Sequence, residues 1–298
     1  MRRRTFIAAG AAALAAAVLT SCSDDGEGEG EGDGSPSPDP DGPRPSGTRE
    51  LRWDSPEVAR FFGARLTARE EGSFGMDRVR LLDAEDPLPG PVLRVSYPAR
   101  SASPTVARRW NRPEGGAQLY LPLRSGPTDT LHLRYYVRFP KGFDFVKGGK
   151  LPGLYGGDVT GGRHIPDGEN GLSTRYMWRS GGRGEVYAYL PTSQEHGTSL
   201  GRGNWRWPTD RWTCVEQAVA LNTPGEPDGS VEVLLDGEQV LLDENLEFRT
   251  VDELKIEGVF FSTFFGGSDP TWATPRTGHA DFAAFAVSGE PIGPVPEV

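Results

Sequence analysis

The 298-residue chain has little of three things: cysteine, long apolar segments and positive charge. Its two cysteines exclude a disulfide framework and a zinc site built from thiolates. Beyond the N-terminus, no apolar run approaches the ~20 residues that a membrane helix needs, which excludes an integral membrane protein. The formal net charge of −10 argues against a general affinity for nucleic acid. We expect no metal, no other cofactor and no nucleic-acid partner.

Residues that break helices are, by contrast, abundant. There are 40 glycines and 26 prolines, too many for a helical bundle. The chain also has 7 tryptophans, 8 tyrosines and 14 phenylalanines. This composition indicates a fold rich in strands and turns.

The first 22 residues are typical of an export signal rather than of a fold. Three arginines, Arg2 to Arg4, precede an Ala-rich apolar stretch. The run Arg3-Arg4-Thr5-Phe6 resembles a twin-arginine signal, the bacterial export route for folded proteins. The run that ends at Cys22 resembles a lipobox. It implies that Cys22 is lipidated and anchors the protein at the extracellular face of the bacterial cell membrane. A plain secretory signal, cut nearby, is the alternative.

Residues 23–48 are predicted to form a disordered acidic linker. They are mostly Gly, Pro, Ser and acidic residues without a large apolar side chain, so they cannot bury enough surface to offset chain entropy. The rest of the chain, 49–298, holds 28 basic and 34 acidic residues, a net charge of about −6. We expect this part to be one domain and the protein to be a monomer.

Patterns typical of antiparallel strands recur along residues 49–298. Segments 173–180 and 185–190 flank a glycine-rich turn and are predicted to pair as a hairpin. The dipeptide Asp236-Gly237 between apolar runs predicts a second hairpin. Strands are expected at 130–139, 230–235, 239–242, 256–265 and 280–287, and one short helix at 55–62. We predict an all-β fold, a jelly-roll β-sandwich of two antiparallel sheets with a concave substrate groove.

Alternation along the first hairpin gathers polar groups on one face of its sheet. Side chains two residues apart lie on the same face of a strand. Ser173 and Arg175 should therefore share a face with Met177 and Arg179, and Tyr187 should share one with Tyr189. Lys150 lies in the segment 147–157, whose many glycines indicate either a flexible loop or backbone that comes close to a ligand.

This combination of residue types suits a negatively charged sugar. Residues 147–190 hold six Lys or Arg side chains and four acidic ones, which makes a basic patch in an acidic domain. A guanidinium can hold a sugar carboxylate through two hydrogen bonds. Tyr can transfer protons, and we expect neighbouring Lys and Arg to lower its pKa. β-Elimination at a uronate needs these groups, whereas glycoside hydrolysis needs a carboxylate pair, which we do not find in one compact motif.

Four segments resemble those of polysaccharide lyase family 14, whose members include alginate and glucuronan lyases with a jelly-roll fold. They are Lys147–Gly157, Ser173–Arg179, Gly184–Tyr189 and Phe260–Asp269, within a similarity that covers roughly residues 90–290. Residues 158–172 match the family less clearly. The resemblance implies a lyase that cleaves an alginate- or glucuronan-type polymer by β-elimination. By motif it assigns catalysis to Lys150, Ser173, Arg175, Tyr187 and Tyr189.

In this interpretation Arg175 holds the substrate carboxylate with the help of Ser173. Lys150, Tyr187 and Tyr189 are the candidates for the base. We expect further substrate contacts from Lys147, Tyr155, Arg163, His164 and Arg179. The alternative function is a non-catalytic, lectin-like domain that binds carbohydrate at the cell surface.

Overall fold

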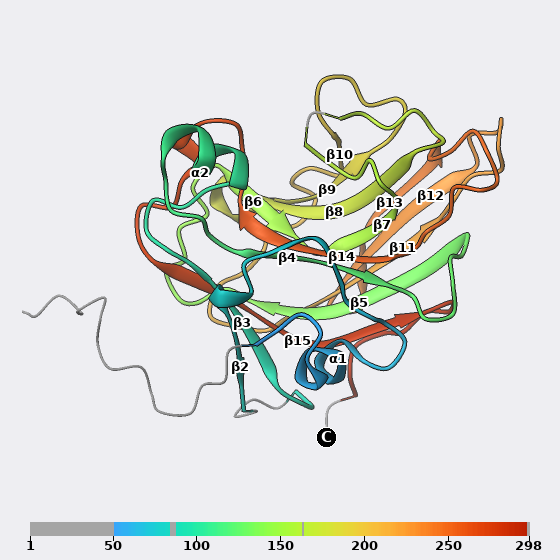
Figure 1. Ribbon diagram of the computed structural model, residues 1–298. Helices are drawn as coiled ribbons and strands as arrows, with labels where there is room; N and C mark the ends of the chain where they lie inside the picture. The colour runs from blue at the N-terminus through green and yellow to red at the C-terminus, as the bar shows by residue number, and fades with distance from the viewer. Residues whose placement is uncertain (1–50, 84–87, 163, 297–298) are drawn as a thin grey trace, which may run out of the picture. The chain divides into compact units, whose positions relative to one another are not determined.

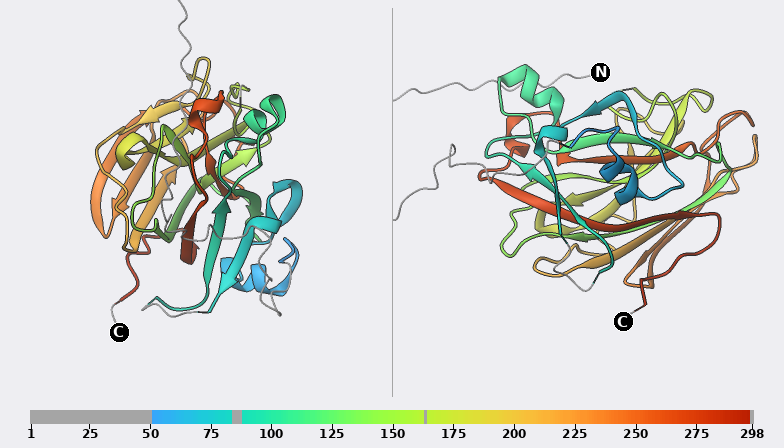
Figure 2. Two further views of the ribbon diagram at one scale, coloured as in Figure 1. Left: turned by 90° about the vertical axis from the view of Figure 1, so that its left-hand side faces the viewer. Right: turned by 60° about the horizontal axis from the view of Figure 1, so that its bottom comes forward.

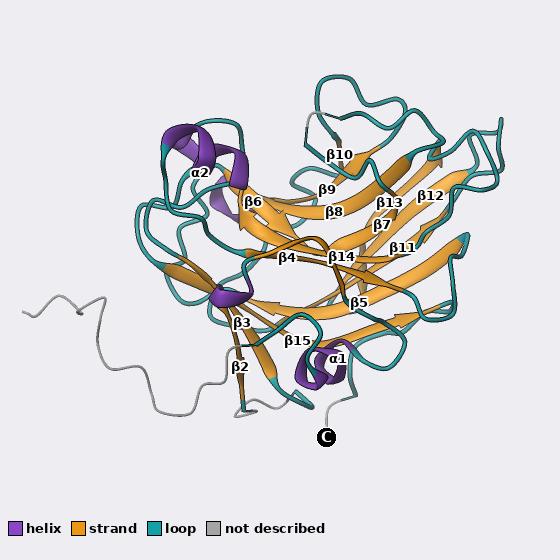
Figure 3. Ribbon diagram, in the orientation of Figure 1, coloured by secondary structure: helices purple, strands orange, loops and turns teal. Residues whose placement is uncertain are grey.

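Among the residues that the structure describes, the strands form two antiparallel sheets, one of eight strands and one of seven (Figure 1). The computed structural model describes residues 51–83, 88–162 and 164–296. Strands dominate these residues, and the helices are short (Figure 3). The predicted all-β sandwich is confirmed. The predicted signal peptide with its lipidation site at Cys22, and the linker 23–48, lie outside the described residues.

Each sheet takes strands from distant parts of the sequence. The eight-stranded sheet contains β1 (Arg69–Phe74), β4 (Ala117–Pro122), β14 (Gly258–Phe265), β6 (Gly148–Leu151), β7 (Gly153–Gly157), β8 (Gly171–Arg179), β9 (Gly184–Tyr189) and β10 (Thr198–Leu200). The seven-stranded sheet contains, in spatial order, β13 (Glu238–Leu246), β12 (Gly229–Leu235), β11 (Thr213–Ala220), β5 (Thr130–Arg138), β15 (Gly278–Ser288), β3 (Val92–Tyr97) and β2 (Val79–Leu82).

The main hydrophobic core forms between the sheets because apolar side chains alternate along the strands. From the eight-stranded sheet, Trp178 and Phe261 are fully buried in it. From the seven-stranded sheet come Tyr135 and Phe285, whose rings stack with centroids 4.9 Å apart. Burying one such side chain contributes about 1.5–3 kcal/mol relative to leaving it in water. The other face of the eight-stranded sheet is thereby left for polar residues.

Both predicted hairpins are present. Strands β8 and β9 pair antiparallel and are joined by the short 3₁₀ turn η2 (Ser180–Gly182). Strands β12 and β13 pair antiparallel and are connected by a turn at Asp236 and Gly237. Both turn residues have positive φ, 51° and 86°. Positive φ at both central residues is what a type I′ turn requires, and Asp-Gly tolerates it well.

The two α-helices lie at the periphery of the strands (Figure 2). The predicted helix is α1 (Pro56–Phe62), which Ser55 caps by accepting a hydrogen bond from the Val58 amide. Helix α2 (Pro104–Trp110) was not predicted, although its sequence carries the same signal, Ser103 as N-cap followed by a proline. Two further 3₁₀ turns are η1 (Met76–Arg78) and η3 (Pro270–Trp272). None of the helices in the described part of the chain has the length and apolar character to cross a lipid bilayer.

The glycine-rich segment 147–157 forms two strands, β6 and β7, so its interpretation as a flexible loop is wrong. Gly149 shows why glycine is needed there. A Cβ on Gly149 would lie 2.0 Å from the Trp178 ring, too close for any side chain. The missing side chain therefore lets a large core residue on the neighbouring strand pack against the backbone of β6.

Candidate active site

The strand registers bring the five predicted catalytic residues together. On the β8–β9 hairpin, Ser173 lies opposite Tyr189 and Arg175 opposite Tyr187. On the other side of β8, Lys150 of β6 lies opposite Met177. Residues opposite one another across strands point to the same face, so all of them lie on the face of the eight-stranded sheet that is directed away from the core. The predicted sharing of a face is confirmed.

Lys150 is a buried amine without an acidic partner in the described part of the chain. Its Nζ lies 3.4 Å from the centroid of the Tyr187 ring and 3.1 Å from the Met177 Sδ. Burial holds the pKa of Lys150 well below its ordinary value, and the positive charges of Arg175 and Arg179 lower it further. The amine is therefore readily neutral, and a neutral amine can accept a proton.

Tyr187 and Tyr189 lie side by side, with ring centroids 5.7 Å apart in an edge-to-face arrangement. Burial raises the pKa of Tyr187 to about 12, and it also raises the pKa of Tyr189. The expectation that nearby Lys and Arg lower these pKa values is wrong, because the loss of hydration outweighs the attraction to Arg179 and Arg175. Both phenols are thus proton donors at neutral pH.

Arg175 carries a buried charge with no carboxylate to balance it among the described residues. Its side chain is only 4% exposed and donates to two neutral oxygens, Ser262 Oγ at 3.2 Å and the Thr160 carbonyl at 3.1 Å. Its Nε has no partner in the described part of the chain. An unpaired buried charge is costly, which marks this guanidinium as a site for an anion.

A short stretch of backbone, Thr160 to Gly162, covers these groups. The Thr160 carbonyl accepts hydrogen bonds from Ser173 Oγ and from Arg175, and the Gly162 carbonyl accepts one from the Tyr189 hydroxyl at 2.7 Å. Ser173, Arg175 and Tyr189 are buried beneath this backbone, Lys150 is buried as well, and Tyr187 is the one with some exposure. Carbonyl oxygens of the protein thus occupy the Ser173 and Tyr189 hydroxyls and one Arg175 donor that would hold a substrate.

Arg179 differs from Arg175 because its charge is compensated. Its guanidinium pairs with Glu185, a fully buried carboxylate of β9, and its Nε donates to Glu185 over 2.8 Å. Arg202 binds the second oxygen of Glu185 at 2.7 Å. The sequence analysis counts Arg179 and Glu185 among the charges of residues 147–190 but does not pair them, since they become neighbours only through the hairpin register.

The other predicted substrate-binding residues are dispersed. Lys147 is exposed and donates to Thr271 Oγ1, and His164 is exposed as well. Tyr155 is fully buried and packs with Tyr120 and Phe260, which leaves it no exposed surface for the predicted contact. Arg163 lies outside the described residues.

Comparison with known proteins supports the resemblance. The family model for polysaccharide lyase 14 matches residues 86–285. The chain belongs to polysaccharide lyase family 14. A search of curated protein sequences finds no significant match.

Solved structures of lyases resemble this family 14 domain. The family 14 alginate lyase from Aplysia kurodai is 30% identical with a TM-score of 0.64, over 73% of this chain and 89% of that one. The alginate lyase vAL-1 from Chlorella virus is 22% identical with a TM-score of 0.64, over 76% and 93%. An endo-β-1,4-glucuronan lyase from Trichoderma reesei is 9% identical with a TM-score of 0.50, over 73% and 90%. The last two similarities show a shared fold.

The sequence analysis missed two residues of this family 14 domain, Ser262 of β14 and Gln118 of β4. They continue the hydrogen bonds of Arg175 along the same face of the sheet. Arg175 donates to Ser262 Oγ, and the Ser262 hydroxyl donates to Gln118 Oε1 at 3.2 Å. The signal was present in the sequence, because Ser262 and Thr263 are polar residues between two pairs of phenylalanines in the segment Phe260–Phe265. The alternation of Ser262 with Phe261 places Ser262 on the polar face.

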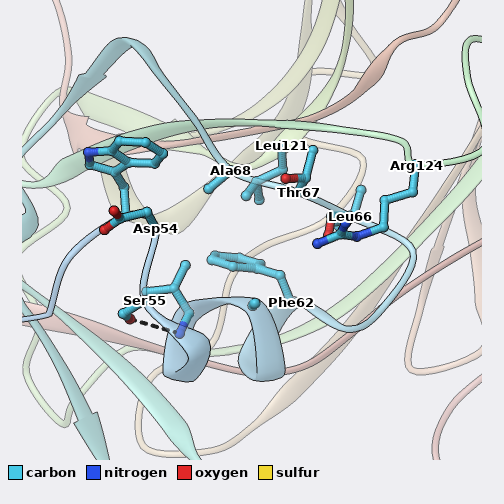
Figure 4. A pocket seen from close by; sticks show the side chains of 11 residues that line it. Asp54, Ser55, Phe62, Leu66, Thr67, Ala68, Leu121 and Arg124 are labelled. Atoms are coloured by element: carbon cyan, nitrogen blue, oxygen red, sulfur yellow. Dashed lines mark hydrogen bonds between the residues drawn. The ribbon is translucent and has the colours of Figure 1, made fainter.

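No cluster of His, Cys, Asp or Glu able to hold a metal occurs among the residues that the structure describes. A cavity of about 150 Å³ lies beside α1, where Trp53, Phe62, Leu121 and Arg124 are among its lining residues (Figure 4). None of the predicted site residues lines it. The cavity and the candidate active site are therefore separate features.

Proposed function

We propose that this protein is a lyase that cleaves a uronic-acid polymer, of the alginate or glucuronan type, by β-elimination. The observation that carries the proposal is the buried, unbalanced guanidinium of Arg175 beside an amine of depressed pKa and two protonated phenols. A carboxylate of the substrate supplies the missing negative charge. Membership of a polysaccharide lyase family and the structural similarity to alginate lyases support this choice.

In the proposed reaction Arg175, Ser173, Lys150 and Tyr189 have separate roles. Arg175, assisted by Ser173, binds the carboxylate and stabilises the enolate that forms when the neighbouring C5 proton leaves. The neutral amine of Lys150 takes that proton. The electron pair of the C–H bond forms the C4–C5 double bond, and the C4–O bond breaks. The Tyr189 hydroxyl gives its proton to the departing oxygen. Proton return from Lys150 to Tyr189 restores the site.

Because the backbone of Thr160 to Gly162 covers the site, this backbone must move before substrate can bind. The Thr160 and Gly162 carbonyls must release Arg175, Ser173 and Tyr189 before substrate can bind them. The substrate's carboxylate and hydroxyl oxygens then replace the two carbonyls as acceptors. This exchange gives the donors released by the two carbonyls new acceptors, so they are not left buried and unpaired.

The test is the unsaturated product. Each cleavage by β-elimination creates a double bond conjugated with the carboxyl group, which absorbs in the ultraviolet. The purified domain should generate this absorbance from alginate, glucuronan or a related polyuronate. Failure on all of them would remove the proposal.

The burial of four of the five residues gives a second candidate function a specific basis. If the covering backbone stays in place, carbohydrate cannot reach the buried catalytic groups, and the domain binds it at the surface above them without cleaving it, as a lectin-like module. Binding of a polyuronate without any unsaturated product would favour this alternative.

We also propose that the chain is exported and anchored through a lipid on Cys22, because its first 22 residues have the pattern of a twin-arginine lipoprotein signal. Expression in a bacterium that processes lipoproteins tests this. The mature N-terminal peptide should begin at a lipid-modified Cys22, and Cys22→Ser should release the protein from membranes. A mature chain that begins elsewhere would contradict the anchor.

A further inference from the structure

A row of side chains crosses the eight-stranded sheet from its edge to the candidate active site. In the strand register, Arg69 of β1 lies opposite Tyr120 of β4, and Tyr120 lies opposite Phe260 of β14. Residues paired in this way point to the same face. Arg69 therefore lies on the face that carries Lys150 and Arg175, although the family match begins only at residue 86.

The row is a continuous stack of charges and rings. The Arg69 guanidinium lies 4.6 Å from the centroid of the Tyr120 ring. The Tyr120 and Phe260 rings stack with centroids 4.3 Å apart. The Arg175 guanidinium lies 4.3 Å from the centroid of Phe260. Two guanidinium groups are thus held on one face, separated by two stacked rings.

Like Arg175, Arg69 has no acidic side chain paired with it in the described part of the chain. In the described part of the chain its side chain forms no ion pair, and its buried Nε has no hydrogen-bond partner. Arg179 and Arg249, by comparison, both pair with acidic side chains. Because Arg69 remains partly exposed, its charge can be reached from outside.

We propose that Arg69 is a second carboxylate-binding residue, which holds a uronate one or two sugars away from the one bound by Arg175. The inference rests on the proposed function, since it takes the Arg175 carboxylate site as given. It adds a specificity: the site selects polymers in which uronates follow one another over polymers in which they alternate with neutral sugars. Tyr120 and Phe260 set the spacing between the two charges.

The experiment compares Arg69→Gln, Arg69→Lys and Arg80→Gln in the domain, with thermal unfolding as a check of the fold. Arg80 is a matched control because it lies on β2, in the other sheet. On a polyuronate, Arg69→Gln should raise KM about tenfold or more, with kcat nearly unchanged, as expected for the loss of one charged hydrogen bond. Arg69→Lys should recover part of the loss, and Arg80→Gln should have no effect.

Binding provides a second measurement that does not depend on turnover. Affinity for a polyuronate oligosaccharide is measured in Lys150→Ala protein with and without Arg69→Gln, and the second change should weaken binding about tenfold. An unchanged KM and affinity in an active enzyme would overturn the role of Arg69 and leave the lyase function intact. A wild-type protein that gives no product but loses affinity on Arg69→Gln would overturn the lyase function and support the subsite. A protein that neither binds nor cleaves polyuronates would overturn both.

Discussion

The amine of Lys150 lies over the ring of Tyr187, 3.4 Å from its centroid. A ring face attracts an ammonium group, yet burial and two nearby guanidinium groups act in the opposite direction on the pKa of Lys150 and prevail. The contact therefore places a weakly basic, readily neutral amine against a phenol that keeps its proton. In the proposed reaction this amine is the proton acceptor, and Tyr189, whose ring centroid lies 5.7 Å from that of Tyr187, is the proton donor.

Lys150→Ala should abolish turnover without disturbing the fold. Loss of a positioned base typically costs about 10²–10⁴-fold in rate, and here kcat should fall by at least that much. The amine makes one side-chain hydrogen bond among the described residues, a weak one to the Met177 sulfur, so unfolding should change little. Initial rates of unsaturated product and a thermal unfolding curve check this. Retained turnover would exclude Lys150 as the base.

The value of kcat/KM should rise with pH as Lys150 loses its proton. This rise should occur at a pH well below the ordinary pKa of a lysine. Arg179 lowers the pKa of Lys150 and Glu185 raises it. Arg179→Gln should therefore move the acidic limb to higher pH, and Glu185→Gln should move it to lower pH. Because burial raises the pKa of Tyr189, the enzyme should stay active up to at least the ordinary phenol value of 10.0.

The two variants can be compared because each breaks the ion pair between Arg179 and Glu185 and they remove charges of opposite sign, although Glu185→Gln also breaks the ion pair with Arg202. Shifts of the acidic limb in the same direction would show that packing, rather than charge, is responsible. No shift in either variant would mean that another group titrates in this limb.

Arg175→Met should separate function from stability. The side chain is buried and has no acidic partner among the described residues, so its charge is a cost to the substrate-free fold. We expect kcat/KM to fall at least about 100-fold, because carboxylate binding and enolate stabilisation are both lost. The free energy of unfolding should stay the same or increase. A clear loss of stability would indicate that Arg175 is a structural residue.

Gly161→Ala tests the covering backbone. A Cβ on Gly161 would lie 2.4 Å from Arg175 Nη2, so the substitution should force this backbone and the guanidinium apart. If the Thr160 and Gly162 carbonyls compete with substrate, KM should decrease. Gly289→Ala is the control, since a Cβ there meets nothing within 4 Å. An increased KM for Gly161→Ala would mean that this backbone helps to bind substrate instead of competing with it.

Alternation was sufficient to group Ser173 with Arg175 and Tyr187 with Tyr189, whereas Lys150 was added by the resemblance to the family. Ser173 and Arg175 lie two apart on one strand, and the glycine-rich turn pairs them with Tyr189 and Tyr187. The same alternation sets Trp178 on the opposite face of β8 from Arg175, and the structure shows that this face packs in the core. These features depend on local geometry that a short sequence segment specifies completely.

Features that depend on distant contacts could not be predicted in this way. The raised pKa of Tyr187 follows from burial, which depends on what packs around the ring. From the sequence alone, Gly149 is compatible with a loop. Its role in a strand depends on the Trp178 ring, which packs against it from a neighbouring strand. The proposed role of Arg69 can be inferred only from the strand register, which places Tyr120 and Phe260 between Arg69 and Arg175.

The most direct test of the central claim compares a polyuronate with the same polymer after chemical reduction of its carboxyl groups. Wild-type domain should release ultraviolet-absorbing product from alginate or glucuronan, whereas the reduced polymer and Lys150→Ala protein should give none. No absorbing product from any polyuronate, or an equal rate on the reduced polymer, would contradict a mechanism in which Arg175 holds a carboxylate while Lys150 removes the neighbouring proton.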